Sequence, residues 1–124
     1  MEKIIAEGMA RLPSFSHAVV AGDTIYVSGS LGTLPNSMEL VAGGVGPETT
    51  QTIANIKRIL EECGAGLDDI VKATVYVSDM STFTEMNNAY LEVFGDSPPA
   101  RITVGGVDLA LGAAVEIDCI AWKP

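Results

Sequence analysis

The sequence predicts an α+β fold in which one sheet carries two helices on one face. Short β-branched runs and two segments of helical periodicity alternate in the order strands, helix, strand, helix, strands. The helices are too few to cover a many-stranded sheet on both sides. With 124 residues, 48% of them apolar, the chain is expected to be a single domain over residues 1–124 with its own core.

The first elements are a strand-like stretch after Met1 and a predicted hairpin. Two apolar runs, Ala18–Ala21 and Thr24–Val27, flank the turn pair Gly22-Asp23. Residues Gly29–Gly46 are rich in Gly, Pro, Asn and Ser, which predicts a loop with one short strand near Met38–Val41.

A first helix is predicted from Pro47, which suits a first helical turn, to Gly64, which suits a C-cap. Its apolar positions recur every three or four residues, at Ile53, Ile56, Ile59, Leu60 and Cys63. The β-branched run Ile70–Val77 then predicts a strand.

A second helix is predicted between a capping box at Thr82 and Glu85 and a stop at Gly95. Its apolar positions are Phe83, Met86, Tyr90, Leu91 and Phe94. The last two strands are predicted at Arg101–Val104 and Ala114–Trp122. In the final strand, alternation places Val115, Ile117, Cys119 and Ala121 on one face. Because two helices cover only one sheet face, we expect a partner subunit on the other.

The charge balance excludes several functions. Sixteen acids against seven scattered bases give a net charge of −9, which disfavours nucleic acid and anionic membrane surfaces. No apolar run approaches the roughly 18 residues of a membrane span, and we expect no secretory leader, because Met1-Glu2-Lys3 leads into a strand-like stretch. The two cysteines have no CxxC partner, so we expect reduced, buried thiols and a cytoplasmic protein.

Arg101 and Glu116 are the main candidates for chemistry. Arg101 begins a strand after Pro98-Pro99, and a guanidinium suits bidentate carboxylate binding, although a salt bridge is the simpler interpretation. Glu116 shares a strand face with Ile120 and Trp122, where a carboxylate either serves catalysis or lies at a solvated sheet edge.

Weaker candidates are Asn87, His17 and the glycine-rich segment Gly43–Gly46. Asn87 lies beside the apolar stripe of the second helix and could bind substrate or only backbone. His17 is the single histidine, so no metal-binding spacing exists, and a surface loop position is its simpler interpretation. The glycine-rich segment lacks the lysine of a phosphate loop and is interpreted as a turn before a helix.

The chain resembles a known family over nearly its whole length. The matching segments are Ser14–Val19, Ile25–Gly29, Asn55–Lys57, Asp69–Val75, Met86-Asn87, Pro99–Arg101 and Val115–Asp118. They are similar to the reactive intermediate deaminases, called Rid or YjgF and often labelled endoribonuclease L-PSP.

This resemblance implies a chorismate-mutase-like α+β fold with one mixed sheet, and a homotrimer with a barrel-like centre and clefts between subunits. It implies hydrolysis of 2-imino acids and enamines to 2-keto acids and ammonia, without metal or organic cofactor. Arg101 would bind the carboxylate of a small substrate, and would be shielded or paired when the cleft is empty. Glu116 would position water. Further substrate-binding positions would be Phe15, His17, Ser28, Gly29, Ser30, Asn87 and Thr103.

Four positions depart from the family pattern: Phe15 replaces Tyr, His17 replaces Gln, Thr103 replaces Cys, and Leu109-Ala110 replaces Leu-Pro. They leave the substrate range open, and His17 could change the preference or accept a proton near neutral pH. The alternatives are a related enamine deaminase of the aminomuconate type, a non-catalytic trimer that binds small carboxylates and, less favoured by charge, a ribonuclease.

Overall fold

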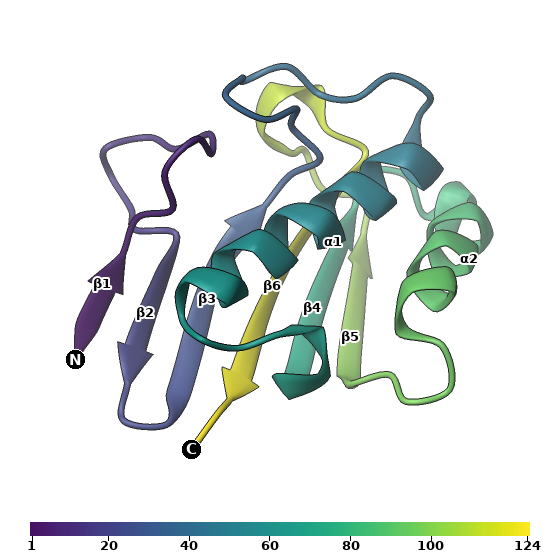
Figure 1. The fold of residues 1–124 in the computed structure, drawn as a ribbon. Helices are drawn as coiled ribbons and strands as arrows, with labels where there is room; N and C mark the ends of the chain where they lie inside the picture. Colours follow the sequence, from purple (N-terminus) through teal and green to yellow (C-terminus); the bar gives the residue numbers. More distant parts are fainter.

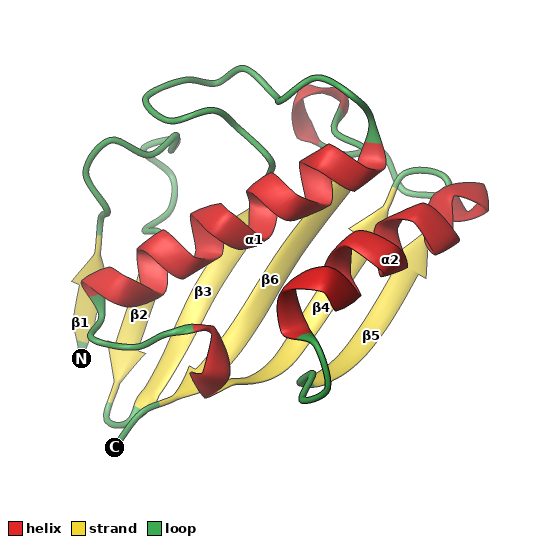
Figure 2. Cartoon of the chain, turned by 45° about the vertical axis from the view of Figure 1, so that its right-hand side comes forward, coloured by secondary structure: helices red, strands yellow, loops and turns green.

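Six strands form one sheet, and two helices cover one of its faces (Figures 1 and 2). The computed structural model describes residues 1–124. The strands are β1 (Glu2–Ile4), β2 (Ala18–Ala21), β3 (Thr24–Ser30), β4 (Ile70–Val77), β5 (Ala100–Gly105) and β6 (Val115–Trp122). The helices are α1 (Val45–Glu62) and α2 (Phe83–Phe94). The predicted α+β class is confirmed.

The sheet is mixed, with the strand order β1-β2-β3-β6-β4-β5. Only β4 and β5 pair in parallel, and α2 lies in the connection between them. Because β6 enters between β3 and β4, the last strand of the chain lies inside the sheet (Figure 1). The C-terminal segment therefore has a neighbour on both sides.

The core lies between the sheet and the helices. On β6 the alternation predicted from sequence is confirmed, because Val115, Ile117, Cys119 and Ala121 are all buried. They meet the apolar stripe of α1, which includes Ile53, Ile56, Ile59 and Leu60. The opposite sheet face has no cover in one chain, and Tyr26, Ile102 and Trp122 are each half-exposed on it.

The turn and the helix end that were predicted from glycines are both confirmed. Gly22 has φ 61° in the two-residue turn between β2 and β3, and Gly64 has φ 74° after the end of α1. Both positions lie in the left-handed region that favours glycine. Helix α1 begins at Val45, so Pro47 falls in its first turn as expected.

Two local predictions were wrong. No capping box forms at Thr82 and Glu85, because the Thr82 hydroxyl donates to the Asp79 carbonyl at 2.7 Å within a short 3₁₀ turn. The expected strand near Met38–Val41 is reduced to a single bridge between Thr33 and Leu40. Both cysteines are free, and only Cys119 is fully buried. Neither helix has the length and apolar character to cross a membrane.

Candidate functional site

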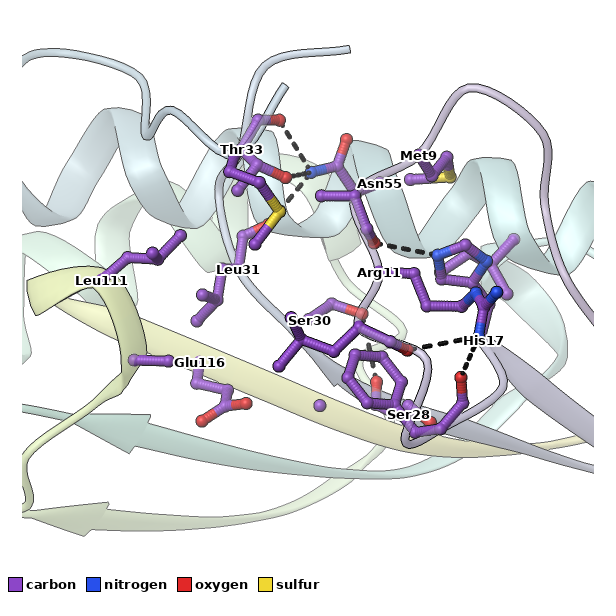
Figure 3. Close-up of a pocket in the computed structure, with 17 residues that line it drawn as sticks. Met9, Arg11, His17, Ser28, Ser30, Leu31, Thr33, Asn55, Leu111 and Glu116 are labelled. Atoms are coloured by element: carbon purple, nitrogen blue, oxygen red, sulfur yellow. Dashed lines mark hydrogen bonds between the residues drawn. The ribbon is translucent and has the colours of Figure 1, made fainter. Parts of the chain in front are cut away.

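A cavity of about 470 Å³ opens beside the end of β3 (Figure 3). Its walls come from α1, β3, β6 and three loops, and most of its large side chains are apolar. Six of the residues predicted for the site line it, namely Phe15, His17, Ser28, Gly29, Ser30 and Glu116. No three metal-binding side chains gather in the chain to hold an ion.

An irregularity in β3 opens room for the Glu116 carboxylate. The pairing with β6 shifts between Val27 and Ser30, so Ser28 and Gly29 leave the regular ladder. A Cβ atom on Gly29 would lie 2.5 Å from Glu116 Oε2, which is closer than real contacts allow. Glycine at this position therefore lets the carboxylate pack directly against the backbone of β3.

The environment of Glu116 favours the neutral carboxyl group more than water does. Burial raises the pKa of Glu116 above its ordinary value, and the nearby negative charge of Asp118 raises it further. A carboxyl whose pKa is moved toward neutrality is better suited to exchange protons with water and substrate.

His17 forms part of the cavity wall, and both of its ring nitrogens are bonded to backbone. Nδ1 accepts the Ala6 N–H at 2.8 Å, and Nε2 lies 2.9 Å from the Ala10 carbonyl oxygen. The first bond requires an unprotonated Nδ1, so Nε2 carries the hydrogen and donates it. The side chain is only 4% exposed, so the surface-loop interpretation was wrong. In this conformation both ring nitrogens of His17 are engaged with backbone, so neither is free to bind a ligand.

The hydroxyl groups at the end of β3 are also engaged with backbone. Ser28 Oγ donates to the Ser16 carbonyl at 2.6 Å, and Ser30 Oγ donates to the Ser28 carbonyl at 3.1 Å. Each oxygen retains its capacity to accept a hydrogen bond. Arg11 closes the nearby loop, because its Nη1 donates to the carbonyls of Leu12 and Phe15 at 3.2 and 2.9 Å.

Arg101 lies elsewhere in the chain, against α2. Its guanidinium carbon is 4.7 Å from the ring centre of Tyr90 and 5.6 Å from that of Phe83. These distances are typical of cation–π contacts, which stabilise a charge without using its N–H groups. The two salt bridges in the chain, Arg58–Glu62 and Lys123–Asp69, do not involve Arg101. Arg101 is therefore shielded by aromatic rings and remains without an anionic partner.

Arg101 and Glu116 point to opposite faces of the sheet. Contact with the α2 rings places Arg101 on the helix-covered face. Glu116 lies between the buried Val115 and Ile117, so it points to the other face. In the sheet register Arg101 pairs with Ala73 on β4, and Ala73 pairs with Cys119 on β6. Glu116 lies three residues before Cys119, so it is two strands across and three residues along from Arg101. These offsets place the α-carbons of Arg101 and Glu116 roughly 14 Å apart.

The predicted residues thus divide into two groups within one chain. Thr103 is two residues after Arg101 and shares its strand face. Asn87 lies one helical turn after Phe83, on the flank of α2 that faces Arg101. None of these three residues lines the cavity that contains Glu116.

Sequence reasoning missed several residues that build the site. Asn55 donates to the carbonyls of Leu31 and Thr33 at 2.9 and 3.0 Å and so fixes the loop after β3 to α1. Glu48, only 6% exposed, accepts the Ala114 N–H at 2.9 Å and fixes the start of β6. Asn55 belongs to one of the segments that match the family, a signal that could have selected it. Glu48 offered only a polar residue close to the helical stripe, which many exposed residues share.

Comparisons with known proteins agree with this architecture. A family model described as Endoribonuclease L-PSP matches residues 7–123. A 2-iminobutanoate/2-iminopropanoate deaminase of Bos taurus is 41% identical over 123 residues, covering 98% of this chain and 90% of its own. A RutC family protein of Pyrococcus abyssi is 42% identical over 109 residues, covering 88% and 86%.

Solved structures give the same result. The YjgF gene product of E. coli superposes with a TM-score of 0.93 at 30% identity, over 100% of both chains. TdcF of E. coli, solved with bound serine, has a TM-score of 0.90 at 26% identity, over 99% of this chain and 100% of its own. The chain therefore belongs to the endoribonuclease L-PSP family, the group that also carries the names YjgF and Rid.

Proposed function

We propose that this protein is a deaminase that hydrolyses 2-imino acids and their enamine tautomers to 2-keto acids and ammonia. The observation that carries the proposal is the unpaired guanidinium of Arg101, which stands ready for a carboxylate. Three mammalian and arthropod relatives carry the name 2-iminobutanoate/2-iminopropanoate deaminase. A relative of similar fold was solved with serine, which bears a carboxylate of the same kind.

We propose further that the site forms between two copies of the chain in a homotrimer. A small imino acid cannot reach both Arg101 and Glu116 of one chain, because they point to opposite sheet faces. A second copy can bring its Arg101 to the Glu116 cavity. The half-exposed Tyr26, Ile102 and Trp122 support such packing, because an apolar sheet face of this kind calls for a cover.

The reaction needs few groups, because the C2 atom of a 2-imino acid is already electrophilic. Arg101 binds the carboxylate with two parallel N–H bonds, which fixes C2 near Glu116. The Glu116 carboxylate takes a proton from water as its oxygen attacks C2. With the imine nitrogen protonated, this attack gives a neutral carbinolamine, which receives that proton on its amino nitrogen. Glu116 then takes the proton of the new hydroxyl group as the C–N bond breaks, so that ammonia leaves and the keto-acid carbonyl forms. The released ammonia carries this last proton away from Glu116, and the raised pKa of Glu116 suits each of these transfers.

The test uses 2-iminopropanoate, generated in situ by an amino-acid oxidase acting on alanine, with semicarbazide as a competing trap. We expect the wild-type protein to speed release of pyruvate and Arg101→Ala or Glu116→Gln to lose this activity. Arg58→Ala serves as the matched control, since Arg58 bonds only to Glu62 and to the Glu7 carbonyl and does not line the Glu116 cavity. Equal decay with and without wild-type protein would refute the 2-imino acid deaminase proposal and would leave the related enamine deaminase, the carboxylate-binding trimer and the ribonuclease as alternatives.

Complementation tests the shared site. The two inactive variants, Arg101→Ala and Glu116→Gln, are expressed together so that mixed trimers form. A site that takes Arg101 from one copy and Glu116 from another then recovers about a quarter of the wild-type sites by random assembly. A site within one chain recovers none.

The ribonuclease alternative has little support. The family description names an endoribonuclease, yet the chain carries a net charge of −9 and its bases do not form a stripe. RNA binding with a steep salt dependence would favour that alternative.

A further inference from the structure

The cavity beside Glu116 is larger than a small imino acid requires. The side chain of 2-iminopropanoate is one methyl group, and that of 2-iminobutanoate is one ethyl group. A volume of about 470 Å³ lies within the range of roughly 300–1,000 Å³ found for sites that enclose whole ligands. In one chain this space extends from Glu116 past Ser30 to the His17 side of the pocket (Figure 3).

The wall of the cavity suits an apolar group. Six large apolar side chains contribute to it, namely Met9, Leu12, Phe15, Leu31, Met38 and Leu111. The polar side chains deep in the wall already have partners. His17 uses both ring nitrogens on backbone, and Asn55 uses its amide on the carbonyls of Leu31 and Thr33. A polar substituent placed beside these two side chains would lose its water without finding a free partner.

Leu111 adds an independent observation. Its φ is 60°, in the left-handed region that a leucine rarely adopts, and the neighbouring Gly112 has φ 67°. The strained backbone places an apolar side chain against the cavity. Strain of this kind persists where the surrounding structure holds it and often lies at ligand sites.

From these observations we infer that the cavity is a subsite for a large apolar substituent of the substrate. The chain would then favour 2-imino acids derived from leucine, methionine or phenylalanine over the one derived from alanine. This inference rests on the proposed deaminase activity.

The first experiment compares imines that an amino-acid oxidase forms from alanine, leucine, phenylalanine and glutamate. We expect kcat/KM for the leucine-derived imine to exceed that for the alanine-derived imine by about 10-fold or more, because each buried methylene contributes to binding. Equal values for the alanine and leucine imines would overturn the subsite. A preference for the glutamate-derived imine would also overturn it and would assign Arg11 to a second carboxylate.

Two substitutions test the position of the subsite. Leu31→Trp fills the cavity and should reduce the leucine-to-alanine ratio of kcat/KM by about 10-fold. Leu34→Trp on the same loop is the matched control, because Leu34 does not line this cavity and should leave the ratio unchanged. Leu111→Gly removes the strain together with the apolar contact, so it should lower the ratio in a protein at least as stable. Ratios unchanged in both Leu31→Trp and Leu111→Gly would place the preference elsewhere and overturn the proposal.

A binding measurement separates this inference from the proposed function. Calorimetry with two keto-acid products, pyruvate and 4-methyl-2-oxopentanoate, needs no turnover. About 10-fold tighter binding of the larger product supports the subsite, and equal binding overturns it. If no imine is turned over while the larger product still binds more tightly, the deaminase proposal fails and the subsite stands.

Discussion

The Arg101 region and the Glu116 region prepare their charged groups in different ways. Arg101 is stabilised by the faces of Phe83 and Tyr90, so all of its N–H donors remain free for a ligand. In the cavity beside Glu116, the polar groups of His17, Ser28 and Ser30 are already bonded to backbone, and burial disfavours the charged carboxylate. The first region is suited to holding an anion, and the second is suited to moving a proton. Substitutions at Glu116 should therefore change mainly kcat, and substitutions at Arg101 should also raise KM.

The largest effect is expected from Glu116→Gln. The amide keeps the shape of the side chain and cannot take a proton, so kcat should fall by about 10²- to 10⁴-fold. KM should stay within a few-fold, because in the proposed site the substrate carboxylate is bound by Arg101. Steady-state kinetics of imine hydrolysis measure both constants. A change in KM alone would contradict the proposed difference between the two regions, because it would mean that Glu116 acts in binding.

Arg101→Lys should have the next largest effect. Lysine keeps the charge but lacks the planar fork, so it cannot form two parallel bonds to a carboxylate. We expect kcat/KM to fall by about 10- to 100-fold, with a clear rise in KM. Activity equal to wild type would mean that only charge matters at this position.

Gly29→Ala probes the contact between β3 and the carboxylate. The new Cβ would lie 2.5 Å from Glu116 Oε2, so the carboxylate must move. A displaced catalytic group should lower kcat by about 10-fold with little change in KM. Gly66→Ala is the matched control, because a Cβ there meets no atom within 4 Å. If both variants keep wild-type kcat, the Gly29 contact does not position Glu116.

The pH dependence should show a smaller effect. The pKa of Glu116 is raised by burial and then by Asp118, so kcat should fall as the pH drops through a value above the ordinary one for Glu. Asp118→Asn removes the second cause and should move this acid limb to lower pH. An unmoved limb would mean that Asp118 does not act on Glu116.

The same raised pKa affects stability. Because the pKa of Glu116 is higher in the folded chain than in the unfolded chain, the neutral carboxyl group stabilises the fold. This stabilisation is fully present below the pKa that Glu116 has in the unfolded chain, and it is lost as the pH rises through the pKa that Glu116 has in the folded chain. Glu116→Gln should therefore be more stable than wild type near pH 7, and the gain should shrink in acid. Urea unfolding of both proteins, near pH 7 and at an acidic pH, measures this difference in the free energy of unfolding.

The smallest effect is expected from Tyr90→Phe. The Tyr90 hydroxyl is buried without a hydrogen-bond partner, while its ring supports Arg101. Removing only the hydroxyl should leave activity within about 2-fold and should leave stability equal or higher by about 1 kcal/mol. Tyr90→Leu removes the ring and should raise KM. A large loss of kcat in Tyr90→Phe would show that the hydroxyl acts on the substrate.

Most of the fold could be predicted because its signals are local. The two-residue turn at Gly22-Asp23, the stripe of α1 and the alternation of β6 depend on neighbouring residues in the chain. The predicted capping box at Thr82 does not form, because the Thr82 hydroxyl donates to the Asp79 carbonyl within a short turn that competes with the helix start. Such competition depends on geometry that the residue types do not reveal.

Residue types and motif order were sufficient to select Arg101 and Glu116 as candidates and to predict one helix-covered sheet. Only the tertiary structure decided that the two side chains point to opposite faces, because a strand's alternation has no absolute direction until its register with other strands is set. It also decided that His17 is bonded to backbone on both nitrogens and that three loops enclose an apolar cavity. These features arise from contacts between segments far apart in the chain, where periodicity carries no information.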